Sequence, residues 1–220
     1  MNALSRWWQG LTGPRAAVDE QRWVVLDVET SGLDAQRARL LAIAALGVHR
    51  EGGRFVIAPA DSFEVVLRYT QAEEGAPDRD NILLHGIGVG AQRDGVARPE
   101  ALARFGAFVG DAPLLAFHAP FDRTMIERAY RLEGLPVPPN PWLDLEPLAG
   151  ALMPQVRARS LDEWMAELGI VCAARHEAAA DTMATAELLQ RLAPRLSVEI
   201  GRGGFAAAQR LAHNRRWVAG

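Results

Sequence analysis

Four carboxylates and one histidine stand in local contexts that suit metal-dependent hydrolysis. They are Asp27 and Glu29 in VVLDVETSGL, Asp122 in LLAFHAPFDR, and His176 and Asp181 in RHEAAADTMATAELL. Side chains two residues apart in a strand share a face, so Asp27 and Glu29 are expected to project together. Adjacent carboxylates raise each other's pKa, and a bound Mg²⁺ or Mn²⁺ removes that cost because hard cations prefer oxygen ligands. The pattern therefore predicts a metal site at the end of a strand.

Each residue also has an ordinary structural interpretation when it is taken alone. Asp122 follows a short apolar run and is expected at the start of a helix, where the helix dipole favours an acid. His176 precedes Asp181 by five residues and is expected in the loop before an alanine-rich helix. A histidine in that position can serve as a general base, although an isolated one is more often a surface residue. Only the combination favours catalysis.

Strands followed by alternating helices and strands are expected to position these residues. The apolar and β-branched runs predict strands at 23–26, 40–48, 54–58 and 114–117, and an extended segment at 63–69. Helices are expected at 120–132, 161–168, 177–192 and 205–215, with another opening at Pro99 and the third ending at Pro194. Ser160 and Glu163 form the pattern of a capping box. This order is typical of an α/β protein with a mixed sheet covered by helices.

Composition sets broad limits on the class of protein. The chain has 220 residues, of which 49% are hydrophobic and 23% charged, and a net charge of −3, which suits one soluble domain and excludes a basic nucleic-acid-coating protein. The single Cys172 fits a reducing compartment, and the absence of an apolar leader or spanning run predicts a cytoplasmic protein with no membrane association. We expect an appendage at 1–22, the catalytic domain at 23–194 and a helical tail at 195–220.

The strings DVETSGL, HAPFD and HEAAAD resemble, in order and spacing, the three motifs of the DEDDh (DnaQ-like) 3′–5′ exonuclease superfamily. This is the group that contains the proofreading epsilon subunit of bacterial DNA polymerase III. The resemblance implies an RNase H-like fold with a five-stranded mixed sheet flanked by helices. It also implies that Asp27, Glu29, Asp122 and Asp181 bind two divalent metal ions, Mg²⁺ or Mn²⁺, and that His176 is the general base. Residue 177 is Glu rather than Tyr, which disfavours the tyrosine-bearing sister branch.

The resemblance also suggests substrate contacts. The segment LLHGI is similar to a family segment that places His85, and with it Asp80, near the terminal nucleotide. Residues from Thr30 to Leu33 would supply backbone donors and an apolar wedge for the terminal base. For His85, the alternative that it is a loop residue with only local contacts is equally well supported by the sequence.

One departure from the family pattern surrounds Asp122. Phe117 and His118 occupy the places where the family usually carries His-Asn. His118 is expected mainly to pack, with some substrate contact. Phe121 is a candidate for base stacking, and core packing is its alternative.

Three functions remain open on this basis. The first is a 3′–5′ exonuclease that acts on single-stranded or frayed DNA and releases nucleoside 5′-monophosphates. The second is an oligoribonuclease-like enzyme that trims RNA, and the third is a catalytically silent module that binds nucleic acid or protein. Nucleic acid is the expected partner, and a DNA polymerase or another protein could dock through the terminal segments.

Overall fold

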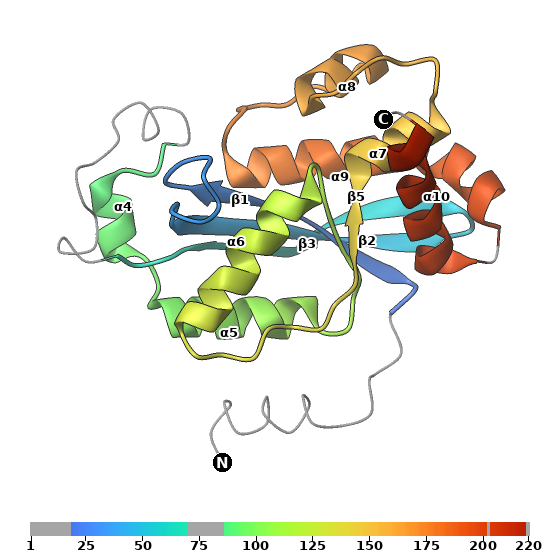
Figure 1. Cartoon of the computed structure of the whole chain (residues 1–220). Helices are drawn as coiled ribbons and strands as arrows, with labels where there is room; N and C mark the ends of the chain where they lie inside the picture. Colours follow the sequence, from blue (N-terminus) through green and yellow to red (C-terminus); the bar gives the residue numbers. More distant parts are fainter. Residues whose placement is uncertain (1–18, 70–85, 202, 219–220) are drawn as a thin grey trace.

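The computed structural model describes residues 19–69, 86–201 and 203–218. Its centre is a five-stranded sheet in the order β3-β2-β1-β4-β5 (Figure 1). The strands are β1 (Arg22–Thr30), β2 (Leu40–Glu51), β3 (Arg54–Val66), β4 (Leu114–Ala116) and β5 (Trp142–Asp144). β1, β2 and β3 pair antiparallel, whereas β4 pairs parallel with both β1 and β5. The expected mixed sheet of an α/β fold is thus confirmed.

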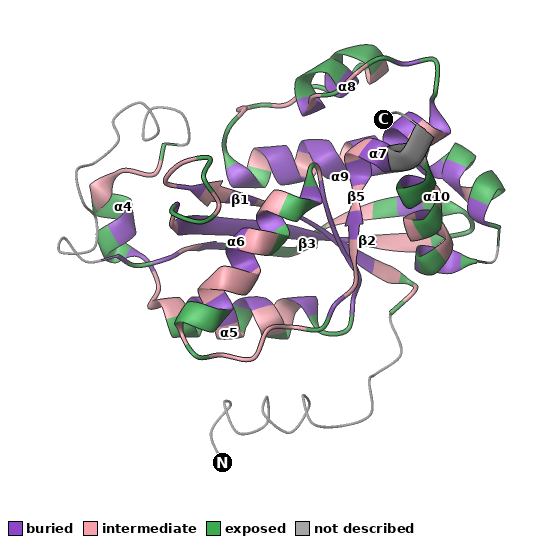
Figure 2. Ribbon diagram, in the orientation of Figure 1, coloured by how far each residue is buried: buried purple, intermediate pink, exposed green. Residues whose placement is uncertain are grey.

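Helices cover both faces of this sheet (Figures 1 and 2). They are α4 (Val89–Asp94), α5 (Arg98–Val109), α6 (Ala119–Leu132), α7 (Leu145–Leu152), α8 (Leu161–Leu168), α9 (Ala178–Ile200) and α10 (Gly204–Val218). One core cluster contains side chains of α7, α8, α9 and α10, and the other contains side chains of α5 and α6. Among the described helices, none is long and apolar enough to span a lipid bilayer.

The alternation of side chains along β1 decides where its acids point. Trp23 and Val25 belong to the cluster beneath α9, whereas Val24 and Leu26 belong to the cluster over α5 and α6. The same period of two places residues 27 and 29 on the α9 face, at the end of the strand. A continuous apolar run buried on both faces therefore ends in two acids that face one helix.

Two elements continue past a proline at which the sequence predicts an end. The expected strand at 54–58 and the extended segment at 63–69 are joined in the single strand β3, which contains Pro59. β3 is an edge strand, where a missing backbone donor is tolerated. Helix α9 does not end at Pro194 but continues to Ile200, because Leu196 and Ile200 remain buried in the core.

Helix α10 packs on the same core as the first strand. Phe205 is buried and meets Trp23 edge-on, with ring centroids 5.0 Å apart. The backbone amide of Phe205 donates to Glu20, at 2.8 Å. The division of the chain at residues 22 and 194 remains a prediction. Residues 1–18 lie outside the described residues.

Candidate active site

Asp27 and Glu29 lie near the C-terminal end of β1, where this strand still pairs with β2. In the register with β2 they lie opposite Ala44 and Ala42, which are small and buried. The hydroxyl of Thr182 on α9 donates to the carbonyl oxygen of Ala44, at 3.3 Å. This contact fixes the first turns of α9 over the pair Asp27–Ala44.

Asp122 reaches the site from α6. The strand β4 ends at Ala116, and α6 begins at residue 119 with Pro120 in its first turn, where the missing amide costs nothing. Asp122 lies in that first turn and is only 4% exposed. The backbone of Val28 on β1 acts to lower the pKa of the Asp122 carboxyl, which places this carboxyl beside the end of β1.

Asp181 reaches the site from the first turn of α9 and is 7% exposed. His176 is exposed, two residues before that helix begins. Its backbone N–H donates to Asp181 Oδ2, at 3.2 Å. The expected relation of a loop histidine to a helix-borne acid is therefore present.

The loops before α6 and α9 share an unusual backbone conformation. Among the described residues, the non-glycine positions with positive φ are His118 (61°) and His176 (65°). His118 directly precedes α6, which carries Asp122, and His176 lies two residues before α9, which carries Asp181. Left-handed backbone at a non-glycine residue costs free energy and tends to be retained at functional sites. Both helix entries are thus held in specific orientations.

The carboxylates act on one another electrostatically. Burial raises the pKa of Asp27 to about 8, and Asp181 contributes in the same direction. Burial, then Asp27 and Asp181, raise the pKa of Glu29 to about 8. Burial and the neighbouring Asp27 also raise the pKa of Asp122 well above its usual value. Four acids are therefore gathered where ionising all of them is costly without positive charge.

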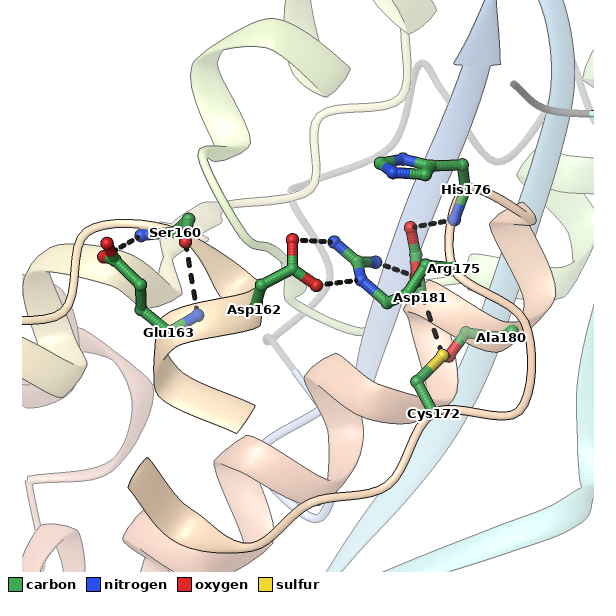
Figure 3. A network of polar contacts seen from close by, with 8 residues as sticks. All are labelled: Ser160, Asp162, Glu163, Cys172, Arg175, His176, Ala180 and Asp181. Carbon is green, nitrogen blue, oxygen red and sulfur yellow. Dashed lines mark hydrogen bonds and ion pairs between the residues drawn. The ribbon is translucent and has the colours of Figure 1, made fainter. Parts of the chain in front are cut away.

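Arg175 supplies positive charge at this place (Figure 3). Its guanidinium group forms ion pairs with Asp181 and with Asp162 of α8. It lowers the pKa of both Asp27 and Glu29, against the effect of burial. The expected capping box of Ser160 and Glu163 is confirmed, and it begins the helix that presents Asp162.

The candidate substrate contacts differ in their surroundings. Leu33 is 92% exposed just beyond β1, whereas Thr30 is buried and its hydroxyl donates to the carbonyl oxygen of Gly32. His118 is exposed, and Phe121 is half-buried against the α5–α6 core cluster. Asp80 and His85 lie outside the described residues.

Comparison with known proteins decides the family. The model of the exonuclease family RNase_T matches residues 24–189, which includes all five site residues. The chain belongs to this exonuclease family. The resemblance read from the three motifs is thereby confirmed.

Relatives of this exonuclease-family chain include proteins named as DNA polymerase III PolC-type or as subunit epsilon-like. The DNA polymerase III PolC-type protein of Bacillus cereus is 32% identical over 174 residues, which cover 79% of this chain and 11% of that protein. The DNA polymerase III subunit epsilon-like protein of Rhodobacter capsulatus is 32% identical over 182 residues, covering 81% of this chain and 25% of that protein. The chain thus spans a minor part of the relatives it matches.

Solved structures share the fold. E. coli exonuclease I in complex with a dT13 oligonucleotide superposes with a TM-score of 0.68 at 17% identity, over 82% of this chain and 43% of that one. The zinc ion bound form of the E. coli exonuclease I–ssDNA complex superposes with a TM-score of 0.66 at 18% identity. The match covers 83% of this chain and 41% of that one. This likeness confirms the RNase H-like fold expected from the motifs.

Three site neighbours were missed by sequence reasoning. Asp144 ends β5 and lies close enough to raise the pKa of Asp122. Cys172 Sγ lies 3.8 Å from Asp181 Oδ1, and Arg175 pairs with the same carboxylate. The acid at the end of the parallel strand WLD was a usable signal, because such ends meet at one sheet edge. Nothing in the sequence pattern connected Cys172 or Arg175 to the site.

A cavity of about 690 Å³ lies between α6, β5, α7 and α10. Its lining includes Arg123, Asp144 and Arg210. None of the five site residues lines this cavity, so it adjoins the carboxylate site through Asp144 without containing it.

Proposed function

We propose that the chain is a divalent-metal-dependent 3′–5′ exonuclease that acts on single-stranded or frayed DNA. The products would be nucleoside 5′-monophosphates. The observation that carries this proposal is the gathering of four acids from β1, α6 and α9, where burial and neighbouring carboxylates raise the pKa of Asp27, Glu29 and Asp122. Such a cluster has little structural value for a fold and considerable value as a cation site.

The donor set fits hard divalent cations. Carboxylate oxygens are the ligands that Mg²⁺ and Mn²⁺ prefer, and Asp27, Glu29, Asp122 and Asp181 would hold two such ions. In the described parts of the chain, no three His, Cys, Asp or Glu side chains are yet arranged as a complete metal site. Asp181 is instead paired with Arg175. The chemistry that divalent cations supply when bound at such sites is activation of water and neutralisation of phosphate charge.

His176 would accept the proton of the attacking water. Its ring is exposed on a loop whose backbone is fixed by the hydrogen bond from His176 N–H to Asp181. The proton acceptor is thereby tied to a residue of the carboxylate cluster. This backbone contact supports the assignment of His176 as a general base beside the reacting phosphate.

The end of β1 would receive the terminal nucleotide. Leu33 offers an exposed apolar surface next to the carboxylates, suited to contact with the face of a base. The site for the terminal nucleotide would also be lined by Thr30, His118 and Phe121. The DNA preference is supported by the relatives, which are DNA polymerase III proteins, and association with a polymerase is part of the same proposal.

The test is the release of mononucleotides from matched DNA and RNA strands labelled at the 3′ end, with Mg²⁺ and with Mn²⁺. The wild-type protein should release nucleoside 5′-monophosphates, faster from DNA. Asp27→Asn should abolish release, and His176→Ala should lower it by about 10²-fold or more, in the range of a lost general base. The exposed Asp111→Asn is the matched control and should behave as wild type.

Faster release from RNA than from DNA would show that the alternative, an exoribonuclease, is correct. Absence of release from both polymers, by folded protein with either metal, would exclude the enzyme and leave the binding-module alternative.

A further inference from the structure

The guanidinium group of Arg175 joins two carboxylates from different helices (Figure 3). Nε and Nη2 donate to the two oxygens of Asp162, at 2.5 and 3.2 Å, while Nη1 donates to Asp181 Oδ1. The Asp162 side chain is 60% exposed, whereas that of Asp181 is 10% exposed. The arginine thus spans from solvent to the interior of the site.

Both oxygens of Asp181 are engaged by donors of the protein. Oδ1 accepts from Arg175, and Oδ2 accepts from the backbone amide of His176, at 3.2 Å. Asp181 is one of the four acids assigned to the cations. A cation that binds Asp181 through Oδ1 therefore competes directly with the guanidinium for the same oxygen.

Arg175 also compensates the charge of the other acids. The positive guanidinium lowers the pKa of Asp27 and of Glu29. Its charge acts where the divalent cations would act, so arginine and metal are electrostatic alternatives at this place.

We propose that Arg175 is the resident counter-ion of the metal-free site, which holds Asp181 until a divalent cation takes that carboxylate, while Asp162 retains the displaced guanidinium. The inference rests on the proposed function, since it assigns Asp181 to the metal. In the exchange, the hydrogen bond between Arg175 and Asp181 is broken and the contact between Asp181 and the cation forms. Arg175 is then a positioning residue that acts through Asp181, and Asp162 is its second anchor.

This exchange predicts that substitutions of Arg175 and of Asp162 change the affinity for the metal in opposite directions. Arg175→Met removes the competitor and the repulsion of its charge, so the metal should bind more tightly. Asp162→Asn removes the carboxylate that keeps the guanidinium after it leaves Asp181, so Arg175 should remain on Asp181 and the metal should bind more weakly. A role limited to linking α8 with α9 would not produce opposite signs.

The experiment is calorimetric titration of Mn²⁺ into the whole 220-residue chain, with all variants compared at one fixed pH in the same buffer. Arg175→Met should lower the Kd by about fivefold, and Asp162→Asn should raise it by a similar factor, as expected for a partly buried, charge-assisted pair. In the double variant, Asp162→Asn should have no further effect, because the guanidinium is absent.

Arg195→Met is the matched control, since it removes an exposed arginine from α9 and should leave the Kd unchanged. Arg175→Lys keeps the charge but not the bidentate fork, and its Kd should fall between those of wild type and Arg175→Met. Circular dichroism of each variant excludes loss of fold as the cause of any change.

The inference is overturned if Arg175→Met weakens Mn²⁺ binding or leaves it unchanged, or if Asp162→Asn retains its effect in the double variant. The proposed function survives those outcomes when the wild-type protein still binds Mn²⁺ and degrades DNA. A wild-type protein that neither binds Mn²⁺ nor releases nucleotides would overturn both.

Discussion

The backbone amide of His118 donates a hydrogen bond to Asp144 Oδ1, at 3.1 Å, and so connects the residue before α6 to the end of β5. The same oxygen accepts from the amide of Glu146, at 3.3 Å, and caps α7. One carboxylate thus fixes the starts of two helices, and the first of these carries Asp122. The hydrogen bond uses the backbone of residue 118, so it does not depend on the side chain there.

Removal of this carboxylate is expected to weaken both stability and activity. Asp144→Ala should cost about 1–2 kcal/mol in the free energy of unfolding, because a helix cap and a loop contact are lost. Nucleotide release should fall as the start of α6 shifts Asp122. Asp144→Asn keeps an acceptor oxygen and should lose less of each. Urea unfolding and the nuclease assay measure the two effects, and full stability with complete inactivity in Asp144→Ala would instead place Asp144 among the reacting groups.

Stability of the metal-free protein should fall as pH rises. Burial raises the pKa values of Asp27 and Glu29 to about 8 in the folded chain, against ordinary values of 3.8 and 4.5. The folded chain therefore holds protons that the unfolded chain releases, so these groups favour folding at low pH and lose that contribution between about pH 4 and 8. Thermal unfolding in EDTA between pH 5 and about 9 should show a declining Tm.

Two controls separate this effect from other titrations. Asp27→Asn should flatten the decline, because one of the raised groups is gone, whereas the exposed Asp111→Asn should not. Saturating Mn²⁺ should also reduce the decline, since the bound cation favours the ionised acids. A Tm that rises with pH over this window in EDTA would contradict the raised pKa values.

The exposed Leu33 should matter for substrate rather than for folding. Its side chain is 92% exposed, so Leu33→Asp should change the free energy of unfolding by less than about 0.5 kcal/mol. Nucleotide release should fall about tenfold through a higher KM, because full burial of a leucine side chain is worth about 1.5–3 kcal/mol and a terminal base would bury part of this one. Val198→Asp, which alters another exposed apolar residue, is the control. An unchanged KM would remove Leu33 from the nucleotide site.

Loss of the aromatic contact between α10 and β1 should destabilise the whole domain. Phe205→Ala removes a buried ring packed edge-on against Trp23 and should cost about 3–5 kcal/mol. Phe205→Leu retains much of the volume and should cost less. Denaturant unfolding followed by tryptophan fluorescence checks both values, and a cost below about 1 kcal/mol would show that α10 contributes little to the core.

Local patterns predicted much of this fold and site. The pair Asp27 and Glu29 was readable because a period of two and an apolar run fix both the strand and its face. The capping box of Ser160 and Glu163 was readable because capping is decided within four residues. The continuation of β3 through Pro59 could not be predicted from the sequence. A proline is tolerated in an edge strand, and only the assembled sheet shows which strand lies at the edge.

The unpredicted part consists of contacts between distant segments. Helix α9 passes Pro194 because packing of Leu196 and Ile200 outweighs a local helix-breaking preference. The pairing of Arg175 with Asp162 joins a loop to a helix thirteen residues away, and no periodicity specifies it. Motifs therefore identify the acids, whereas charge compensation around them emerges only in three dimensions.

The packing of Phe205 against Trp23 also bears on how the protein is made. The strand that carries Asp27 and Glu29 leaves the ribosome well before α10, whose Phe205 packs on the Trp23 ring together with Phe55. A nascent chain therefore holds Trp23 incompletely buried until residue 205 has emerged. Synthesis that stops before this point yields a fragment with an unfinished core, so completion of the core depends on translation through α10.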